Sequence, residues 1–161
     1  MKSILITLML FFSICIYSQQ QVVHITPQQI ADHIKNTSSR KTVIQFWNPN
    51  CKEVLDILKE YKAITAAHDK EADFYFVAIT SKDSLIINAI KESNYTYTLY
   101  VADASVDPDL YERMPAFCKK MCRLLHIEET EFLTLCLDKN DNVTYKGDVV
   151  FSEIEKVIPL K

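Results

Sequence analysis

Apolar residues follow two different periods along this chain, and their alternation predicts an α/β protein. Short runs rich in β-branched and aromatic residues are typical of buried strands, whereas apolar residues three or four positions apart are typical of amphipathic helices. The predicted strands are 22–25, 42–47, 73–80, 132–137 and 143–146, with a further extended segment at 95–102. The predicted helices are a segment that begins at Thr26-Pro27, then 51–68, 84–93, 115–127 and 152–157.

The order of these elements is β-α-β-α-β, then an α-β excursion, then α-β-β-α. Helices that alternate with apolar strands predict a sheet covered on both faces. A polar turn at 138–142 joins the last two predicted strands into a hairpin. The length of the segment 19–161 is that of one domain.

The N-terminus has the pattern of an export signal. Lys2 is followed by an apolar run over residues 4–17, which is short for a membrane span of ~20 residues. We therefore predict a signal peptide at 1–18, cleaved before Gln19, and a protein exported to the periplasm, the cell surface or the medium. An uncleaved anchor and a lipoprotein modified at Cys15 are the two alternatives. Nothing after residue 18 is long and apolar enough to span a membrane.

Charge and glycine content exclude several classes of function. The chain has 18 Lys and Arg residues and 21 Asp and Glu residues. Lys2 lies before residue 19 and all the acidic residues lie after it, so the segment after residue 18 has a negative net charge. No basic stripe occurs, and we expect no nucleic-acid partner. The one glycine, Gly147, rules out a glycine-rich phosphate loop or dinucleotide-binding turn.

The most informative motif is the segment 46–54, Phe-Trp-Asn-Pro-Asn-Cys-Lys-Glu-Val. It predicts that the strand 42–47 delivers Cys51 to the N-terminus of the helix 51–68. Unpaired backbone N–H groups and the positive end of the helix dipole favour a thiolate there. Cys51 is therefore the candidate catalytic nucleophile.

Phe46, Trp47 and Cys51 resemble the thioredoxin superfamily, in particular its exported TlpA-like branch. The resemblance implies a thioredoxin-like α/β fold, with a central mixed sheet flanked by helices and an α-β insert at 84–102. It also implies a second cysteine in a Cys-x-x-Cys motif, at the position that Val54 occupies here.

The same branch carries a cis-proline shortly before a hydrophobic-Asp pair, which here is Leu137-Asp138. The corresponding residue is Phe132 or Glu131, and a non-proline residue predicts a trans bond. In the family this proline shapes the groove beside the cysteines. The resemblance therefore implies a binding groove formed by Trp47, Asn50, Val54, Glu131 and Phe132.

A degenerate site limits the chemistry that we predict. Thiol–disulfide exchange passes through a mixed disulfide that a second thiol must resolve, and Val54 offers none. Cys51 then supports at most monothiol redox chemistry with protein or peptide thiols and disulfides, and no cofactor is expected. The alternative is a non-catalytic module of the same fold that binds a peptide or protein. Pairing of Cys51 with Cys118 or Cys122 stays open.

A third hypothesis is a metal carrier. Cys118, Cys122 and His126 follow one another at i, i+4 and i+8 and, with Cys51, could supply zinc or copper(I) ligands. Both cysteines also lie on an apolar stripe, and we favour the interpretation that they are core residues, as for Cys136. We likewise favour a solvated acidic loop at 103–109 over a calcium site.

Overall fold

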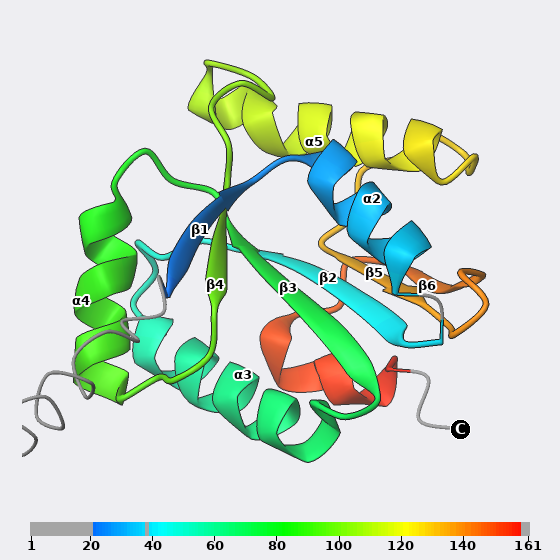
Figure 1. Cartoon of the computed structure of the whole chain (residues 1–161). Coiled ribbons are helices and arrows are strands. Elements are labelled where there is room, and N and C mark those ends of the chain that lie inside the picture. Colours follow the sequence, from blue (N-terminus) through cyan, green and yellow to red (C-terminus); the bar gives the residue numbers. More distant parts are fainter. Residues whose placement is uncertain (1–20, 38, 159–161) are drawn as a thin grey trace, which may run out of the picture.

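A six-stranded mixed sheet runs through the part of the chain that the structure describes, residues 21–37 and 39–158 (Figure 1). The structure is a computed structural model. The strands lie in the order β1-β4-β3-β2-β5-β6. Strands β1 to β4 are parallel to one another, β5 is antiparallel to β2, and β6 is antiparallel to β5. The strands are β1 (Val22–Ile25), β2 (Lys41–Trp47), β3 (Ala72–Ala78), β4 (Leu99–Ala102), β5 (Thr134–Leu137) and β6 (Val143–Gly147).

Helices cover both faces of this sheet, as Figure 1 shows. One face carries α2 (Pro27–Asn36) and α5 (Leu110–Leu124), which contact each other. The other face carries α3 (Val54–His68), α4 (Asp83–Ser93) and the short 3-10 helix η1 (Phe151–Lys156). The predicted α/β class, with a central mixed sheet flanked by helices, is therefore confirmed.

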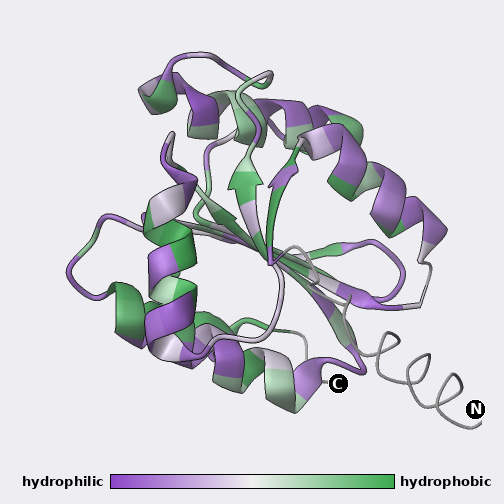
Figure 2. Cartoon of the chain, turned by 60° about the vertical axis from the view of Figure 1, so that its left-hand side comes forward, coloured by the Kyte–Doolittle hydropathy of each residue, from purple (hydrophilic) through white to green (hydrophobic). Residues whose placement is uncertain are grey.

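The sheet separates two hydrophobic cores. In the core under α2 and α5, Phe46 packs edge-on against Phe117 at a centroid distance of 5.3 Å. In the core under α3 and α4, Tyr61 stacks on Phe76 at 3.6 Å. Figure 2 shows the strands largely in hydrophobic colours and the helices banded with hydrophilic ones. The period-2 and period-3.6 patterns of the sequence thus fill two cores, one on each side of the sheet.

The segment α4-β4 is the insert predicted in the middle of the fold. Val22↔Leu99 begins the parallel pairing of β1 with β4, and Val77↔Tyr100 joins β4 to β3. The inserted strand therefore lies between β1 and β3, within the sheet instead of at its edge.

Local signals explain most element boundaries. Thr26 caps α2: its side chain accepts from the backbone of Gln29, and the Gln29 side chain accepts from the backbone of Thr26. The prediction that Pro115 opens its helix was wrong, because Asp109 caps α5 by accepting from the Tyr111 N–H at 2.8 Å. Pro115 consequently lies inside the helix, where it removes one intrahelical hydrogen bond.

The predicted signal peptide at 1–18, including Cys15, lies outside the described residues. Within the described ranges, no helix combines the length and apolar character needed to cross a bilayer.

Candidate functional site

Cys51 lies in a turn that precedes α3, not at the first residue of the helix. The Asn48 side chain accepts from the Asn50 N–H at 2.9 Å, and the Asn48 carbonyl accepts from the Cys51 N–H at 3.3 Å. Such side-chain-to-backbone bonds compete with helix formation. The helix therefore starts at Val54, and the expectation that Cys51 opens it was wrong.

The Cys51 thiol is half-buried and packs against the core under α3 and α4. Tyr61 in that core has its pKa raised by burial, and further by the nearby Tyr95 and Cys51. The Tyr61 hydroxyl and the Trp47 indole N–H are both buried and have no hydrogen-bond partner among the described residues. Two unused donors therefore lie in the core that contacts this cysteine.

Position 54 offers no second thiol. Val54 is the first residue of α3 and is partly buried against the same core as Cys51. The other described cysteines, Cys118, Cys122 and Cys136, are free and fully buried. Burial raises the pKa of Cys118 and of Cys136 to about 12 in each case. Of the cysteines that the structure describes, Cys51 alone reaches solvent.

A groove of about 640 Å³ opens next to this turn, beyond the carboxyl ends of β2 and β3. Its polar lining includes Asn48, Asn50, Lys82 and Glu131. Its apolar lining includes Trp47, Ile79, Leu85, Leu110, Met114 and Leu133. A mainly apolar groove with a few polar groups is typical of a ligand-binding surface.

Only some of the residues predicted to form the groove line it in the structure. Trp47, Asn50 and Glu131 do line the groove. Phe132 does not: it is fully buried and packs against Phe46 at a centroid distance of 5.8 Å. Val54 packs into the core beside Cys51. Within the described ranges no peptide bond is cis, so the bond before Phe132 is trans.

Sequence reasoning missed the side of the groove that α5 supplies. Tyr111, near the start of α5, is 88% exposed at the rim, and Met114 lies one turn further along. No local pattern marks these two residues as binding residues. The rule that ligands bind beyond the carboxyl ends of parallel strands would have pointed to this side once the topology was known.

A buried arginine joins the loops that follow β3 and β4, next to the groove. Arg113 of α5 donates to the carbonyls of Thr80, Asp107 and Pro108 at 3.3, 2.8 and 3.3 Å. It is only 5% exposed. Arg113 lies four residues before Phe117, which belongs to the apolar stripe of the helix. This spacing was the sequence signal that could have revealed the burial of Arg113.

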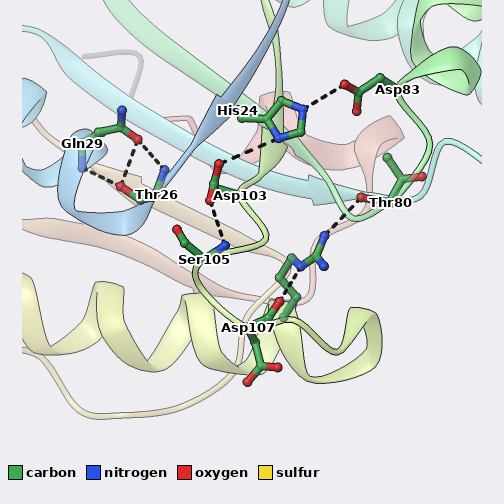
Figure 3. Close-up of polar contacts among 9 residues, drawn as sticks. His24, Thr26, Gln29, Thr80, Asp83, Asp103, Ser105 and Asp107 are labelled. Atoms are coloured by element: carbon green, nitrogen blue, oxygen red, sulfur yellow. Dashed lines mark hydrogen bonds and ion pairs between the residues drawn. The ribbon is translucent and has the colours of Figure 1, made fainter.

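Beside Arg113, a histidine joins three elements (Figure 3). His24 Nε2 of β1 lies 2.9 Å from Asp83 Oδ2 of α4, and Nδ1 lies 3.9 Å from Asp103 Oδ2 in the loop after β4. The carboxylate of Asp103 accepts from the Ser105 N–H at 2.8 Å, and hydrogen bonds from Ser105 lower the pKa of Asp103. These contacts tie the ends of β1 and β4 to the start of α4.

The acidic loop uses its carboxylates to hold backbone groups. Asp107 accepts from the Asp109 N–H at 2.9 Å, as Asp103 does from Ser105 and Asp109 does from Tyr111. These are the local side-chain bonds typical of turns and helix starts.

The proposed metal ligands do not come together. Cys118 and Cys122 are buried in the core, where their thiols donate to the carbonyls of Phe132 and Thr130. His126 lies beyond the end of α5 and is exposed. Across the ranges that the structure describes, no group of three or more His, Cys, Asp or Glu side chains is placed to hold a metal ion.

Neither a known protein family nor a curated protein matches the sequence. Solved structures are similar to this chain at low identity. A secreted disulfide oxidoreductase from Mycobacterium tuberculosis is 12% identical over 76% of this chain and 82% of its own, with a TM-score of 0.46. A thiol:disulfide interchange protein of the thioredoxin family from Chlorobium tepidum is 14% identical, over 77% and 81%, with a TM-score of 0.48.

A third similar structure is the thioredoxin domain of a thiol-disulfide oxidoreductase from Bacteroides vulgatus. It is 16% identical over 77% of this chain and 83% of its own, with a TM-score of 0.45. Four parallel strands continue into an antiparallel hairpin, with helices on both faces and β4 inserted next to β3. The fold is thioredoxin-like.

Proposed function

We propose that this protein binds a peptide or protein segment in the groove beyond β2 and β3, and that Cys51 supports at most monothiol chemistry there. One observation supports this most strongly: Cys51 is the one described cysteine that reaches solvent, and Val54 stands where a resolving thiol would be needed. The groove supplies an apolar surface, and Trp47, Asn48 and Asn50 belong both to its lining and to the segment that precedes the cysteine.

The monothiol reaction would proceed as one exchange. The Cys51 thiolate attacks a disulfide of the partner, a bond forms between the Cys51 sulfur and one partner sulfur, and the other partner sulfur leaves as a thiolate. No net oxidation occurs in this step. Release requires a second thiol from outside the protein, because Cys118, Cys122 and Cys136 are buried.

The second candidate is a purely non-catalytic binding module. The half-burial of Cys51 against the core favours it, and so does the composition of the groove, whose lining does not include the cysteine. We do not propose a metal carrier, because Cys118 and Cys122 are buried while His126 is exposed.

Thiol labelling distinguishes the two candidates. We expect an alkylating reagent to label Cys51 in the folded protein, and to reach Cys118, Cys122 and Cys136 only after denaturation. We expect the protein to release one equivalent of chromogenic thiol from a peptide disulfide that carries such a leaving group. The Cys51→Ser variant should release none. If Cys51 is labelled as slowly as the buried cysteines, the monothiol proposal fails and the binding module is the better description.

We also propose that residues 1–18 direct export and that the domain comprises residues 19–161. The proposal depends on Lys2 and the apolar run that follows it. N-terminal sequencing of protein recovered outside the cytoplasm should begin at Gln19. An intact Met1 on that material would contradict cleavage, and labelling of Cys15 with lipid would favour the lipoprotein.

A further inference from the structure

A second opening lies at the other end of the sheet, where β3 and β4 part. β2 accompanies β3 from Lys41↔Ala72 onward, but β4 pairs with β3 only at Val77↔Tyr100 and Ala78↔Val101. Figure 1 shows the two strands diverging toward their amino ends. The opening between them is a pocket of about 210 Å³, which we call the aromatic slot.

The walls of the aromatic slot are mostly rings. The Tyr75 and Tyr100 rings lie 5.1 Å apart at an interplanar angle of 41°. Tyr75 also contacts His33 of α2 through its hydroxyl. The aromatic side chains that line the slot are Phe74, Tyr75, Phe76, Tyr95, Tyr97 and Tyr100.

One carboxylate oxygen of the slot has no partner. Asp73 Oδ1 accepts from Arg40 Nε at 2.8 Å, but Asp73 Oδ2 is buried and unpaired among the described residues. Arg40 is not free to serve both oxygens, because its other nitrogens donate to the carbonyls of Asp69, Lys70 and Ala72. A buried acceptor without a donor is unfavourable, so an incoming donor would be stabilising.

The charge of the lining has the sign that attracts a cation. Asp69 and Asp73 both line the slot, against the single guanidinium of Arg40. Burial raises the pKa of Tyr75 and of Tyr100, and the Asp73 carboxylate raises both further. The Asp73 carboxylate and both rings thus line the same slot, in which the two phenols are neutral.

We propose that the aromatic slot binds a small organic cation that carries a hydrogen-bond donor, either a primary ammonium group or a quaternary ammonium group with a hydroxyl, with a few carbon atoms. The faces of Tyr75 and Tyr100 would attract the positive charge, as aromatic rings do for ammonium ligands, and Asp73 Oδ2 would neutralise it. The volume is below the ≈300–1,000 Å³ of drug-sized sites, which limits the ligand to a small group. This proposal is independent of Cys51 and of the groove.

Two probes of the same shape test the proposal. Choline carries the charge, and 3,3-dimethylbutan-1-ol replaces its nitrogen by carbon. We expect choline to shift the ring resonances of Tyr75 and Tyr100 in a saturable manner, with an affinity at least about tenfold above that of the neutral alcohol. Equal responses to the two probes, or no saturable response to choline and butylammonium, would overturn the proposal.

Variants identify the groups responsible. Tyr100→Phe should keep choline binding and Tyr100→Leu should lose most of it, because only the first keeps an aromatic face. Asp73→Asn should weaken binding at least about fivefold, whereas Asp32→Asn, an exposed carboxylate on α2, should not. If the Asp73→Asn variant fails to fold, the comparison of Tyr100→Phe with Tyr100→Leu still tests the proposal. Unchanged binding in Tyr100→Leu would contradict the slot, and so would a loss of binding in Tyr111→Ala at the distant groove.

Discussion

The two ends of the sheet are built from different chemistry. At the carboxyl end, Cys51 stands beside a mainly apolar groove, and the residue three positions further along is the valine Val54. At the amino end, tyrosine rings and Asp73 line the same slot, and Asp73 Oδ2 has no donor among the described residues. One end thus combines a half-buried thiol with an apolar surface, while the other holds a polar atom that its described surroundings do not use. The two ends are therefore suited to different ligands.

The largest effect should be on disulfide reduction, and it should come from a second thiol at position 54. Val54→Cys would place a second sulfur three residues after Cys51, where it can resolve a mixed disulfide intramolecularly. Because intramolecular reactions have high effective concentrations, we expect disulfide reduction in an insulin assay to rise at least about tenfold over the unmodified protein. Val54→Ser is the matched control and should show no gain. Robust reduction by the unmodified protein would contradict the proposal of a single-cysteine site.

The next effect concerns the buried arginine at the carboxyl end. Arg113→Ala leaves the carbonyls of Thr80, Asp107 and Pro108 without their donor, so the free energy of unfolding should fall by about 2–4 kcal/mol. Chemical denaturation measures this change. Arg123→Ala, on the same helix but in an exposed pair with Glu129, is the control, and we expect no measurable change in the free energy of unfolding. Equal losses in both variants would show that Arg113 has no special role in the loop.

Tyrosine ionisation should reveal the burial of the phenols at the amino end of the sheet. Unfolded phenols lose their protons near pH 10, but burial raises the pKa of Tyr75 and Tyr100 in the folded protein. Their contribution to stability is therefore full below about pH 10 and declines as the pH rises through their folded-state pKa values. In a spectrophotometric titration, Tyr75→Phe should remove amplitude from the late phase, at pH values above those at which unfolded phenols ionise. Loss of early amplitude in Tyr75→Phe would contradict its burial.

The smallest effect on stability should come from Tyr111 at the rim of the groove. Because its side chain is 88% exposed, Tyr111→Ala should change the free energy of unfolding by less than about 0.5 kcal/mol. If the groove binds a peptide, the same variant should weaken that binding while leaving Cys51 labelling unchanged. A variant with lower stability and normal binding would show that Tyr111 serves the fold and not the groove.

Periodicity predicted the architecture well because each element carries its own apolar pattern. The strand at β3 and the stripe of α3 needed no information from elsewhere in the chain, and the predicted insert lies where expected. Helix starts were less predictable. Polar side chains decided them: Asn48 delays α3 until Val54, and Asp109 starts α5 before Pro115.

The candidate site was only partly predictable. The motif around Cys51 located Trp47 and Asn50 in the groove, but the far wall comes from α5, whose position follows from packing. Phe132 was assigned to the groove by counting along the strand, although its ring points into the core. The aromatic slot had no sequence signal, because it depends on where β3 and β4 stop pairing.

The position of β4 has a consequence for how this chain is assembled. Among the described strands, β1 pairs only with β4, and this pairing runs from Val22↔Leu99 to Ile25↔Ala102. During synthesis β1 must therefore wait until Ala102 has emerged before it can pair. Contacts so distant in sequence close slowly. Although β1 is synthesised before the other described strands, it is thus expected to be among the last to join the sheet.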